Sequence, residues 1–234
     1  MKLPYLDAYH LILSRFTGHF ATSSHSRQTA TGTSSSPVTN SRFHFRKTVP
    51  KKLKGNHWQL QAIQQDNAAL IYDAYLSHHS ALTQADQKSH LKEPYTWQEY
   101  LKQMATYDQD HQTHKTFSFI VLNKAATKCL GMVQIGPLRP FLYYNNAPVH
   151  LMIRAGDNAA MITYWLTPCT AESTFPCQFI QALQGWFAHD WEFDDYFFRV
   201  NPSEAHCLFP LADSGLTAHF NLKVPPHNYA FYGN

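Results

Sequence analysis

The chain has 234 residues, of which 44% are hydrophobic and 15% aromatic, so it is long and apolar enough to bury one sizeable core. Its formal net charge is +3, and no run approaches the ~18 apolar residues that a membrane-spanning helix requires. The N-terminal apolar stretch 11–13 is too short for the core of a signal peptide. Membrane insertion and classical secretion are therefore not expected, and we expect a globular protein of the cytoplasm.

The charge is unevenly distributed along the chain. Residues 1–55 hold nine Lys or Arg against one acid, whereas the remainder holds ten against fifteen. Because residues 17–41 are mostly Ser, Thr, Gly and Ala, we predict that they are flexible. The chain thus divides into a basic segment, 1–55, and a folded domain, 56–234. The segment has the composition of a solvated tail, an organellar transit peptide or an arm for an acidic partner. It lacks the interleaved aromatic and basic residues of an RNA-binding module, so nucleic-acid binding is not expected.

Local patterns predict the first half of the domain. Trp58–Ile63 alternates as a half-buried strand does, and Asp66 is expected to cap a helix with an apolar face at Leu70, Ile71, Ala74 and Tyr75. Thr96-Trp-Gln-Glu99 is a capping-box pattern that predicts a second helix start. The runs 116–122 and 129–135, joined by a polar turn, predict an antiparallel hairpin.

The second half of the domain continues with shorter signals. After an irregular excursion, 137–148, we predict strands at 149–153 and 160–166 around a turn at 156–158. A helix over 175–189, a strand over 195–200 and a last helix over 201–216 follow. The aromatic residues of the helix-to-strand junction are predicted core: Trp186, Trp191, Phe193, Tyr196, Phe197 and Phe198. The order predicts an α+β fold with a mixed, mostly antiparallel central sheet flanked by helices.

This order from His57 to Tyr232 resembles that of the GNAT superfamily of N-acetyltransferases, nearest the branch that acetylates ribosomal-protein N-termini. The resembling pieces are Ile63, Asp66 through Tyr75, Thr96 to Tyr100, Leu130-Gly131, Tyr164-Trp-Leu-Thr-Pro168 and Gly215-Leu216. The resemblance implies an acyl-CoA N-acyltransferase that uses acetyl-CoA and a primary amine of a protein, peptide or small molecule. It leaves the oligomeric state open.

The resemblance also implies where acetyl-CoA is held. Backbone N–H groups at a helix start suit its pyrophosphate, because the helix dipole favours an anion there. In the family this loop usually has the pattern R/Q-x-x-G-x-G/A. The corresponding segment here, Cys169–Pro176, has no Gly, Arg or Lys, and its Glu172 adds a negative charge. Pro176 suits the first turn of the helix, and Ser173 or Thr174 its cap. The expected cofactor contacts are Leu166, Thr167, Thr170, Ala171, Glu172, Ser173, Thr174 and Phe175.

The catalytic positions of the family are altered in this chain. The base is often a Glu three residues before the Tyr of Tyr164-Trp-Leu, where this chain has Met161, so His150, Asp157 and Glu204 are the nearest candidate bases. Counting back from Gly215 places Glu204 at the family's Asn position and Cys207 at its Ser position. Cys207 is therefore either a proton donor to the leaving CoA thiolate or a small buried side chain. The expected catalytic residues are Cys207, Glu204 and His150.

Two function classes follow from this pattern. The first is the acetyl-CoA-dependent acyltransferase, and the second is a catalytically inactive GNAT-like domain that binds a ligand or a protein. The four cysteines form no CxxC pair, and we expect reduced thiols. His78-His79, His111, His114 and His219 have no Cys or carboxylate partner at a metal-ligand spacing, so we expect surface histidines and no metal.

Overall fold

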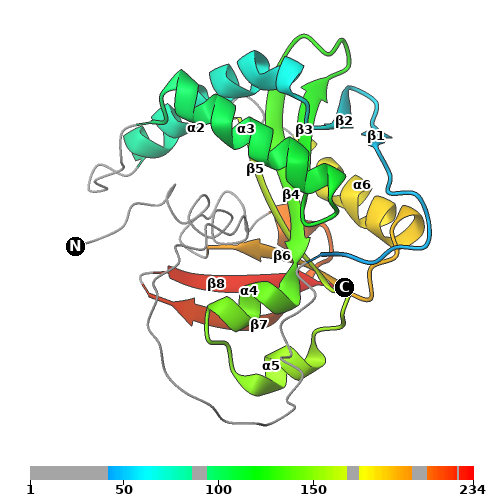
Figure 1. Ribbon diagram of the computed structural model, residues 1–234. Coiled ribbons are helices and arrows are strands. Elements are labelled where there is room, and N and C mark those ends of the chain that lie inside the picture. Colours follow the sequence, from blue (N-terminus) through cyan, green and yellow to red (C-terminus); the bar gives the residue numbers. More distant parts are fainter. Residues whose placement is uncertain (1–41, 86–93, 168–173, 202–209, 226) are drawn as a thin grey trace, which may run out of the picture.

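The protein is described by a computed structural model over residues 42–85, 94–167, 174–201, 210–225 and 227–234 (Figure 1). Its centre is one eight-stranded sheet of order β1-β2-β3-β4-β5-β6-β8-β7. Among these neighbours only β5 and β6 are parallel, and the other pairs are antiparallel. The predicted α+β fold with a mixed, mostly antiparallel sheet is confirmed.

The elements have the following bounds. The strands are β1 (Lys52–Lys54), β2 (Trp58–Ala62), β3 (Phe117–Asn123), β4 (Cys129–Pro137), β5 (Ala160–Leu166), β6 (Tyr196–Val200), β7 (Thr217–Val224) and β8 (His227–Gly233). The helices are the 3-10 turn η1 (Gln65–Asn67), α2 (Ala68–Ala85), α3 (Trp97–Gln112), α4 (Leu138–Tyr144), α5 (Val149–Arg154) and α6 (Phe175–Asp190). A short helical stretch also covers residues 210–213.

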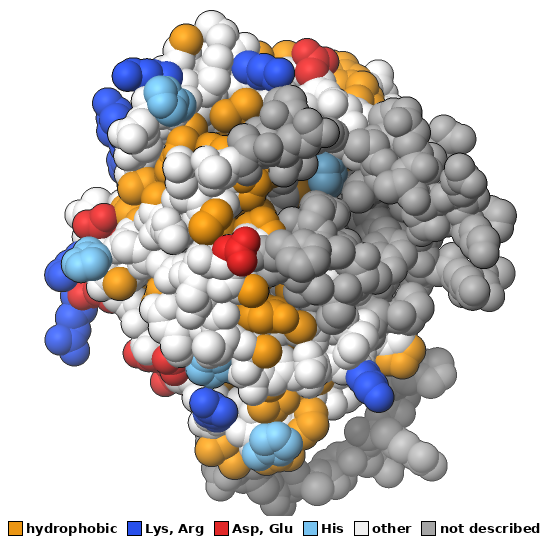
Figure 2. All heavy atoms as spheres, turned by 180° about the vertical axis from the view of Figure 1, so that it is seen from behind, with side chains coloured by type: hydrophobic (Ala, Val, Ile, Leu, Met, Phe, Trp, Pro, Cys, Tyr) orange, Lys and Arg blue, Asp and Glu red, His pale blue; other side chains and the backbone are white. Residues whose placement is uncertain are grey.

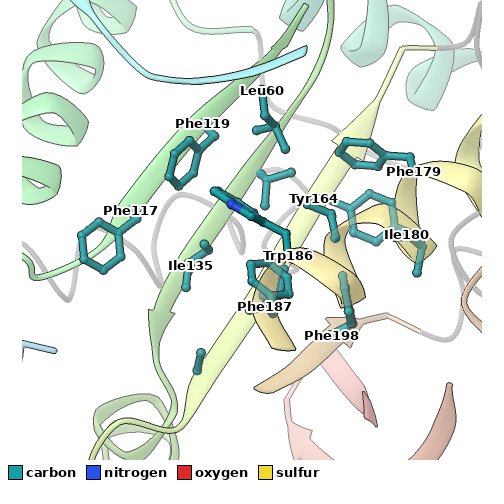
Figure 3. Packing of buried hydrophobic residues seen from close by; sticks show 14 of the residues in the cluster. Leu60, Phe117, Phe119, Ile135, Tyr164, Phe179, Ile180, Trp186, Phe187 and Phe198 are labelled. Carbon is teal, nitrogen blue, oxygen red and sulfur yellow. The ribbon is translucent and has the colours of Figure 1, made fainter. Parts of the chain in front are cut away.

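One face of the sheet packs on α6. Phe179, Leu183 and Trp186 of this helix are buried with Phe119 of β3 and Tyr164 of β5 in the largest apolar cluster. Figure 3 shows the α6 side chains pointing into the space above β3, β4 and β5. The Trp186 ring meets those of Phe119 and Trp191 edge-on, at centroid distances of 5.1 and 5.2 Å. The predicted aromatic core is confirmed for Trp186, Trp191 and Phe198, whereas Phe193 and Tyr196 are only partly buried against it and Phe197 lies in a cluster on the opposite face.

The opposite face carries two separate clusters. Side chains alternate between faces along a strand, so Ile120 points away from its neighbour Phe119, and Met161 points away from Ile162. Helices α2 and α3 cover Ile120 and the rest of the second cluster, whereas α4 and α5 cover Met161 and the third. Figure 1 places these helix pairs at opposite ends of the molecule. The part of the sheet between these two clusters includes the place where β5 and β6 separate.

Two of the predicted elements form through local polar bonds. The Glu99 amide donates to the Thr96 hydroxyl, and the Glu99 carboxylate accepts from the Thr96 amide at 2.9 Å, so the predicted capping box is present. In the β3–β4 turn the Asn123 carboxamide oxygen accepts from the amides of Thr127 and Lys128. These bonds fix the hairpin that the sequence predicted.

Residues 149–153, predicted as a strand, form helix α5 instead. The alternation of Val149, Leu151 and Ile153 favoured a strand, but only Leu151 is buried. Val149 and Ile153 lie four residues apart on an outer helical face and are 64% and 75% exposed. Pro148, at the N-cap, has a φ of −53° that suits a helix start. The excursion before it also contains a helix, α4.

Two further predictions differ from the structure near the N-terminal end of the domain. Asp66 does not cap α2, because it lies inside η1 and the long helix begins only at Ala68. The domain also begins before residue 56, because Phe43 is 2% exposed within the main core and β1 pairs with β2. The predicted flexible segment, 17–41, lies outside the described residues.

Candidate active site at the splayed strands

The parallel strands β5 and β6 separate part-way along their length. They pair only at Ala160↔Tyr196, Met161↔Phe197 and Ile162↔Phe198. Beyond this point β5 continues to Leu166 and stays paired with β4, whereas β6 continues to Val200 and stays paired with β8. We call the region between residues 163–166 and 199–200 the splay.

Backbone polarity can be assigned along the edge of β5 at the splay. The Ala160 N–H donates to the Asp195 carbonyl at 2.8 Å, so the peptide groups of Ala160 face β6. In an extended strand every second residue points its N–H and C=O to the same side. The peptide groups of Leu166 therefore point toward the splay, while the Thr167 N–H donates in the other direction, to Leu130. An extended ligand between the strands could bond to this edge as an added strand does.

Helix α6 starts beyond the splay and presents a first turn suited to an anion. Thr174 occupies its N-cap position and makes no side-chain cap bond, and its hydroxyl accepts from the Gln178 side chain at 3.3 Å. Pro176 lies in the first turn, as predicted, and that turn holds no acidic residue. The N–H groups at such a helix start attract an anion. Thr170 to Ser173, which include four of the expected cofactor contacts, lie outside the described residues.

A glycine fixes the far end of β5. Gly131 of β4 pairs with Leu166 and has a φ of +155°. A β-carbon added to it would lie 2.1 Å from the carbonyl oxygen of Trp165. Only glycine permits this approach, so residue 131 sets how closely the end of β5 stays bound to β4 while β6 turns away.

A row of buried polar side chains crosses the sheet beside the splay. Ser118, Gln134 and Thr163 are in register on β3, β4 and β5, and they point away from α6. On β6, Arg199 follows the last β5–β6 pair and points to the same face. Its guanidinium lies 5.1 Å from the Phe141 ring centroid and 4.6 Å from that of Tyr229. All four are under 9% exposed, so the face opposite α6 is polar where the strands separate.

The predicted catalytic residues are not brought together by the described structure. His150 is exposed on α5, which precedes β5, and so lies toward the opposite end of that strand from Leu166. Asp157 is exposed and pairs with Arg139. Glu204 and Cys207 lie outside the described residues. Met161, at the family's base position, is 2% exposed and opposite Phe197 in the third cluster.

The prediction of surface histidines is wrong for two members of the set. His79 is buried beside Tyr75. The His111 ring lies between Phe117 and Phe119, and its Nδ1 lies 3.2 Å from the Ser118 carbonyl oxygen and 3.3 Å from the Ser118 amide. Burial lowers the pKa of His111, so this imidazole is held in its neutral form. The Ser118 carbonyl already accepts from the Ile63 amide, so the group that the neutral ring satisfies is the Ser118 N–H, which donates to Nδ1.

Tyr100, Tyr107 and Cys129 on this face stay protonated and uncharged at pH 7. Burial raises the pKa of Tyr100 and Tyr107 above their ordinary value and that of the Cys129 thiol to about 12. Cys129 and Cys177 are free thiols, as predicted for them, while Cys169 and Cys207 lie outside the described residues. Within the described part of the chain no three side chains form a metal-binding group, and no helix is long and apolar enough to cross a bilayer.

A cavity of about 440 Å³ lies at another part of the sheet, where β2 meets the end of α3. Its lining includes Lys47, Lys51, Asp108, His111 and His114. Figure 2 shows Lys and Arg side chains along one edge of the molecule and others elsewhere on the same face. Three strand spacings, about 14 Å, separate β2 from β5. The cavity is therefore distinct from the splay, and its charges of both signs select no single ligand class.

Comparison with solved structures assigns the fold. RimL, a ribosomal alpha-N-protein acetyltransferase in complex with coenzyme A, has a TM-score of 0.57 and 14% identity over 77% of this chain and 94% of that one. A ribosomal-protein-alanine acetyltransferase from Vibrio fischeri has a TM-score of 0.59 and 13% identity over 79% and 96%. The self-immunity acetyltransferase MccE in complex with acetyl-CoA and AMP has a TM-score of 0.57 and 13% identity over 77% and 93%.

The chain has the GNAT fold. The resemblance to this superfamily is confirmed at the level of fold, and ribosomal-protein acetyltransferases are among the similar structures, as expected. No family model and no curated protein matches the sequence. The sequence analysis did not predict that Arg199 and the row of buried polar side chains lie beside the splay. The available signal was a single Arg in the otherwise apolar strand Tyr196–Val200.

Proposed function

We propose that the protein transfers an acetyl or related acyl group from acyl-CoA to a primary amine of a protein, peptide or small molecule. The observation that carries the proposal is the splay: β5 and β6 pair through Ile162↔Phe198 and then part, with the start of α6 next in the chain. The similar structures that contain coenzyme A or acetyl-CoA support the choice of cosubstrate.

The described residues fit an acyl-CoA in two places. The extended pantetheine arm would lie along β5, where the peptide groups of Leu166 point into the splay. The pyrophosphate would lie at the first turn of α6, near Thr174 and Phe175, together with the expected contacts Thr167, Thr170, Ala171, Glu172 and Ser173. The amine would approach from the face opposite α6, because α6 and its cluster fill the other face.

Binding of acetyl-CoA, measured by calorimetry, tests the first half of the proposal. Thr174→Glu adds a negative charge at the helix start. We expect it to weaken acetyl-CoA binding about tenfold or more, because the added carboxylate repels the pyrophosphate that the partial positive charge of the helix start attracts. Gln181→Glu adds the same charge to the same helix about 10 Å further along, at an exposed position, and is the matched control. Equal affinity of both variants and the parent protein would contradict the site.

Transfer is tested separately, by chromatography of released CoA during incubation with primary amines. The panel should hold peptides that begin with Ala or Ser, free lysine and simple alkylamines. CoA release that depends on the amine, with an acetylated product of the expected mass, is the predicted result.

The second candidate function is a catalytically inactive domain that binds a ligand or a protein, and two observations favour it. Met161 occupies the family's base position and is buried among apolar side chains, and the segment 169–176 lacks glycine. Saturable acetyl-CoA binding with no transfer to any amine would favour the inactive ligand-binding or protein-binding domain. Absence of binding at millimolar acetyl-CoA would remove the acyltransferase proposal itself.

A further inference from the structure

A histidine of α2 points at the sheet beside the splay. Ile71, Ala74, Tyr75 and His78 stand at i, i+3, i+4 and i+7, which is one face of a helix. The first three are buried against the sheet in the second cluster. Because His78 continues their stripe, its side chain faces the same surface of the sheet.

The contact made by His78 locates it more closely. Its imidazole is stacked on the indole of Trp165, with ring centroids 5.1 Å apart and an interplanar angle of 22°. Trp165 lies on β5 three residues beyond Ile162, the last residue that pairs with β6, and is opposite Met132 of β4. The imidazole thus lies over the splayed part of β5, on the face opposite α6.

Among the residues that the structure describes, the titratable groups around this imidazole are mainly tyrosines and one thiol. The titratable side chains from α2, α3 and β4 that belong to the second cluster or pack against it are Tyr72, Tyr75, Tyr100, Tyr107 and Cys129, and His79 follows on α2. Burial raises the pKa of Tyr100, Tyr107 and Cys129, so these three stay protonated and uncharged near neutral pH. An ordinary imidazole titrates near pH ~6.5.

We propose that His78 is the general base of acyl transfer, in place of the family carboxylate that Met161 replaces. The inference rests on the proposed function. The neutral amine attacks the thioester carbonyl carbon, a C–N bond forms, and collapse of the tetrahedral centre breaks the C–S bond. His78 accepts the proton that the amine nitrogen loses, and the CoA thiolate leaves with the bonding electron pair and takes up a proton. Trp165 holds the imidazole over the strand edge.

The test compares His78→Gln with His189→Gln, in the full chain. His189 is an exposed histidine in the last turn of α6, far along that helix from its first turn, and its ring contacts the Gly185 carbonyl. For His78→Gln we expect kcat to fall about 100-fold or more while the Kd for acetyl-CoA stays within about threefold. The limb that an imidazole gives the pH profile of kcat should vanish, and added imidazole should partly restore the rate of His78→Ala.

The outcomes separate the two proposals. If the parent protein binds acetyl-CoA and acetylates an amine but His78→Gln keeps its kcat and its pH profile, the assignment of His78 is overturned and the acyltransferase stands. A loss of kcat that follows a lower melting temperature, without rescue by imidazole, also overturns it. If the parent protein transfers no acetyl group, both the proposed activity and this role of His78 fail.

Discussion

The two faces of the sheet differ in what they bury. On the α6 face the cluster is apolar and aromatic throughout, and none of the buried polar side chains on the described strands points to it. The opposite face buries Ser118, Gln134, Thr163 and Arg199 between its two apolar clusters. Burying such groups costs free energy unless they are bonded, and one of them, Gln134, bonds to the Tyr107 side chain of α3.

The two faces therefore have different expected roles: the α6 face stabilises the fold, and the opposite face forms the candidate site. The α6 face joins β3, β4 and β5 to one helix through large rings, and it holds the splay in shape from behind. The opposite face meets the splay at Thr163, Trp165 and Arg199, with His78 above. Changes on the α6 face are therefore expected to act on unfolding, and changes on the other face on turnover.

Trp186→Ala should have the largest effect on stability. The side chain is 3% exposed and packs on Phe119, Phe187 and Trp191, so its loss leaves a large cavity. We expect the free energy of unfolding, measured by urea denaturation, to fall by about 3–5 kcal/mol. Trp97→Ala, at a tryptophan that is 40% exposed, is the control and should cost under about 1 kcal/mol. Equal losses would break the contrast between the buried core and the surface.

Gly131→Ala should have the next largest effect and should touch both stability and binding. Its new methyl group would meet the Trp165 carbonyl, which forces β4 away from the end of β5. We expect a loss of about 1–3 kcal/mol in unfolding free energy together with weaker acetyl-CoA binding.

Gly185→Ala is the matched control for that substitution. This glycine lies inside α6 with nothing within 4 Å of an added β-carbon. Alanine there should stabilise the protein by about 0.5–1 kcal/mol, because it favours the helix, and should leave acetyl-CoA binding unchanged. Destabilisation by the control would mean that helix α6 has less room than the structure gives it.

A structural feature could be predicted from the sequence when the residues that form it lie close together in the chain. The Thr96 cap and the Asn123 turn were found because their partners lie three to five residues away. The order of elements also predicted the GNAT fold. Helix α5 was missed because its alternation suits a strand, and only contact with the sheet shows that Leu151 alone is buried.

The residues of the candidate site needed three-dimensional information. His78 belongs to an apolar helical stripe, but the sequence does not say that this stripe lies over Trp165. Arg199 is distinguished from an edge residue only by the rings of Phe141 and Tyr229, which come from α4 and β8. The positions expected from family spacing, Met161 and His150, are respectively a buried apolar contact and an exposed helix residue.

His111 should give stability a dependence on pH. Burial holds its folded-state pKa below the ordinary value of 6.5, so its contribution is present above that pH and is lost as the pH falls through the folded-state pKa. We expect the free energy of unfolding to fall between pH 7.5 and 5, by more in the parent protein than in His111→Gln. Identical pH dependence in the two proteins would place the titrating group elsewhere.

Ser118→Ala should have the smallest effect on the free energy of unfolding, and the sign of that change is informative. The Ser118 hydroxyl is buried, and no described group bonds to it, while His111 contacts only the backbone of this residue. Removing a buried hydroxyl without a partner should leave the unfolding free energy unchanged or raise it by up to about 1 kcal/mol. A rise in stability with slower acetyl transfer would mean that the polar row serves the amine. A loss of stability would mean that the hydroxyl is bonded in the folded protein, and the polar row would then contribute to stability as the α6 face does.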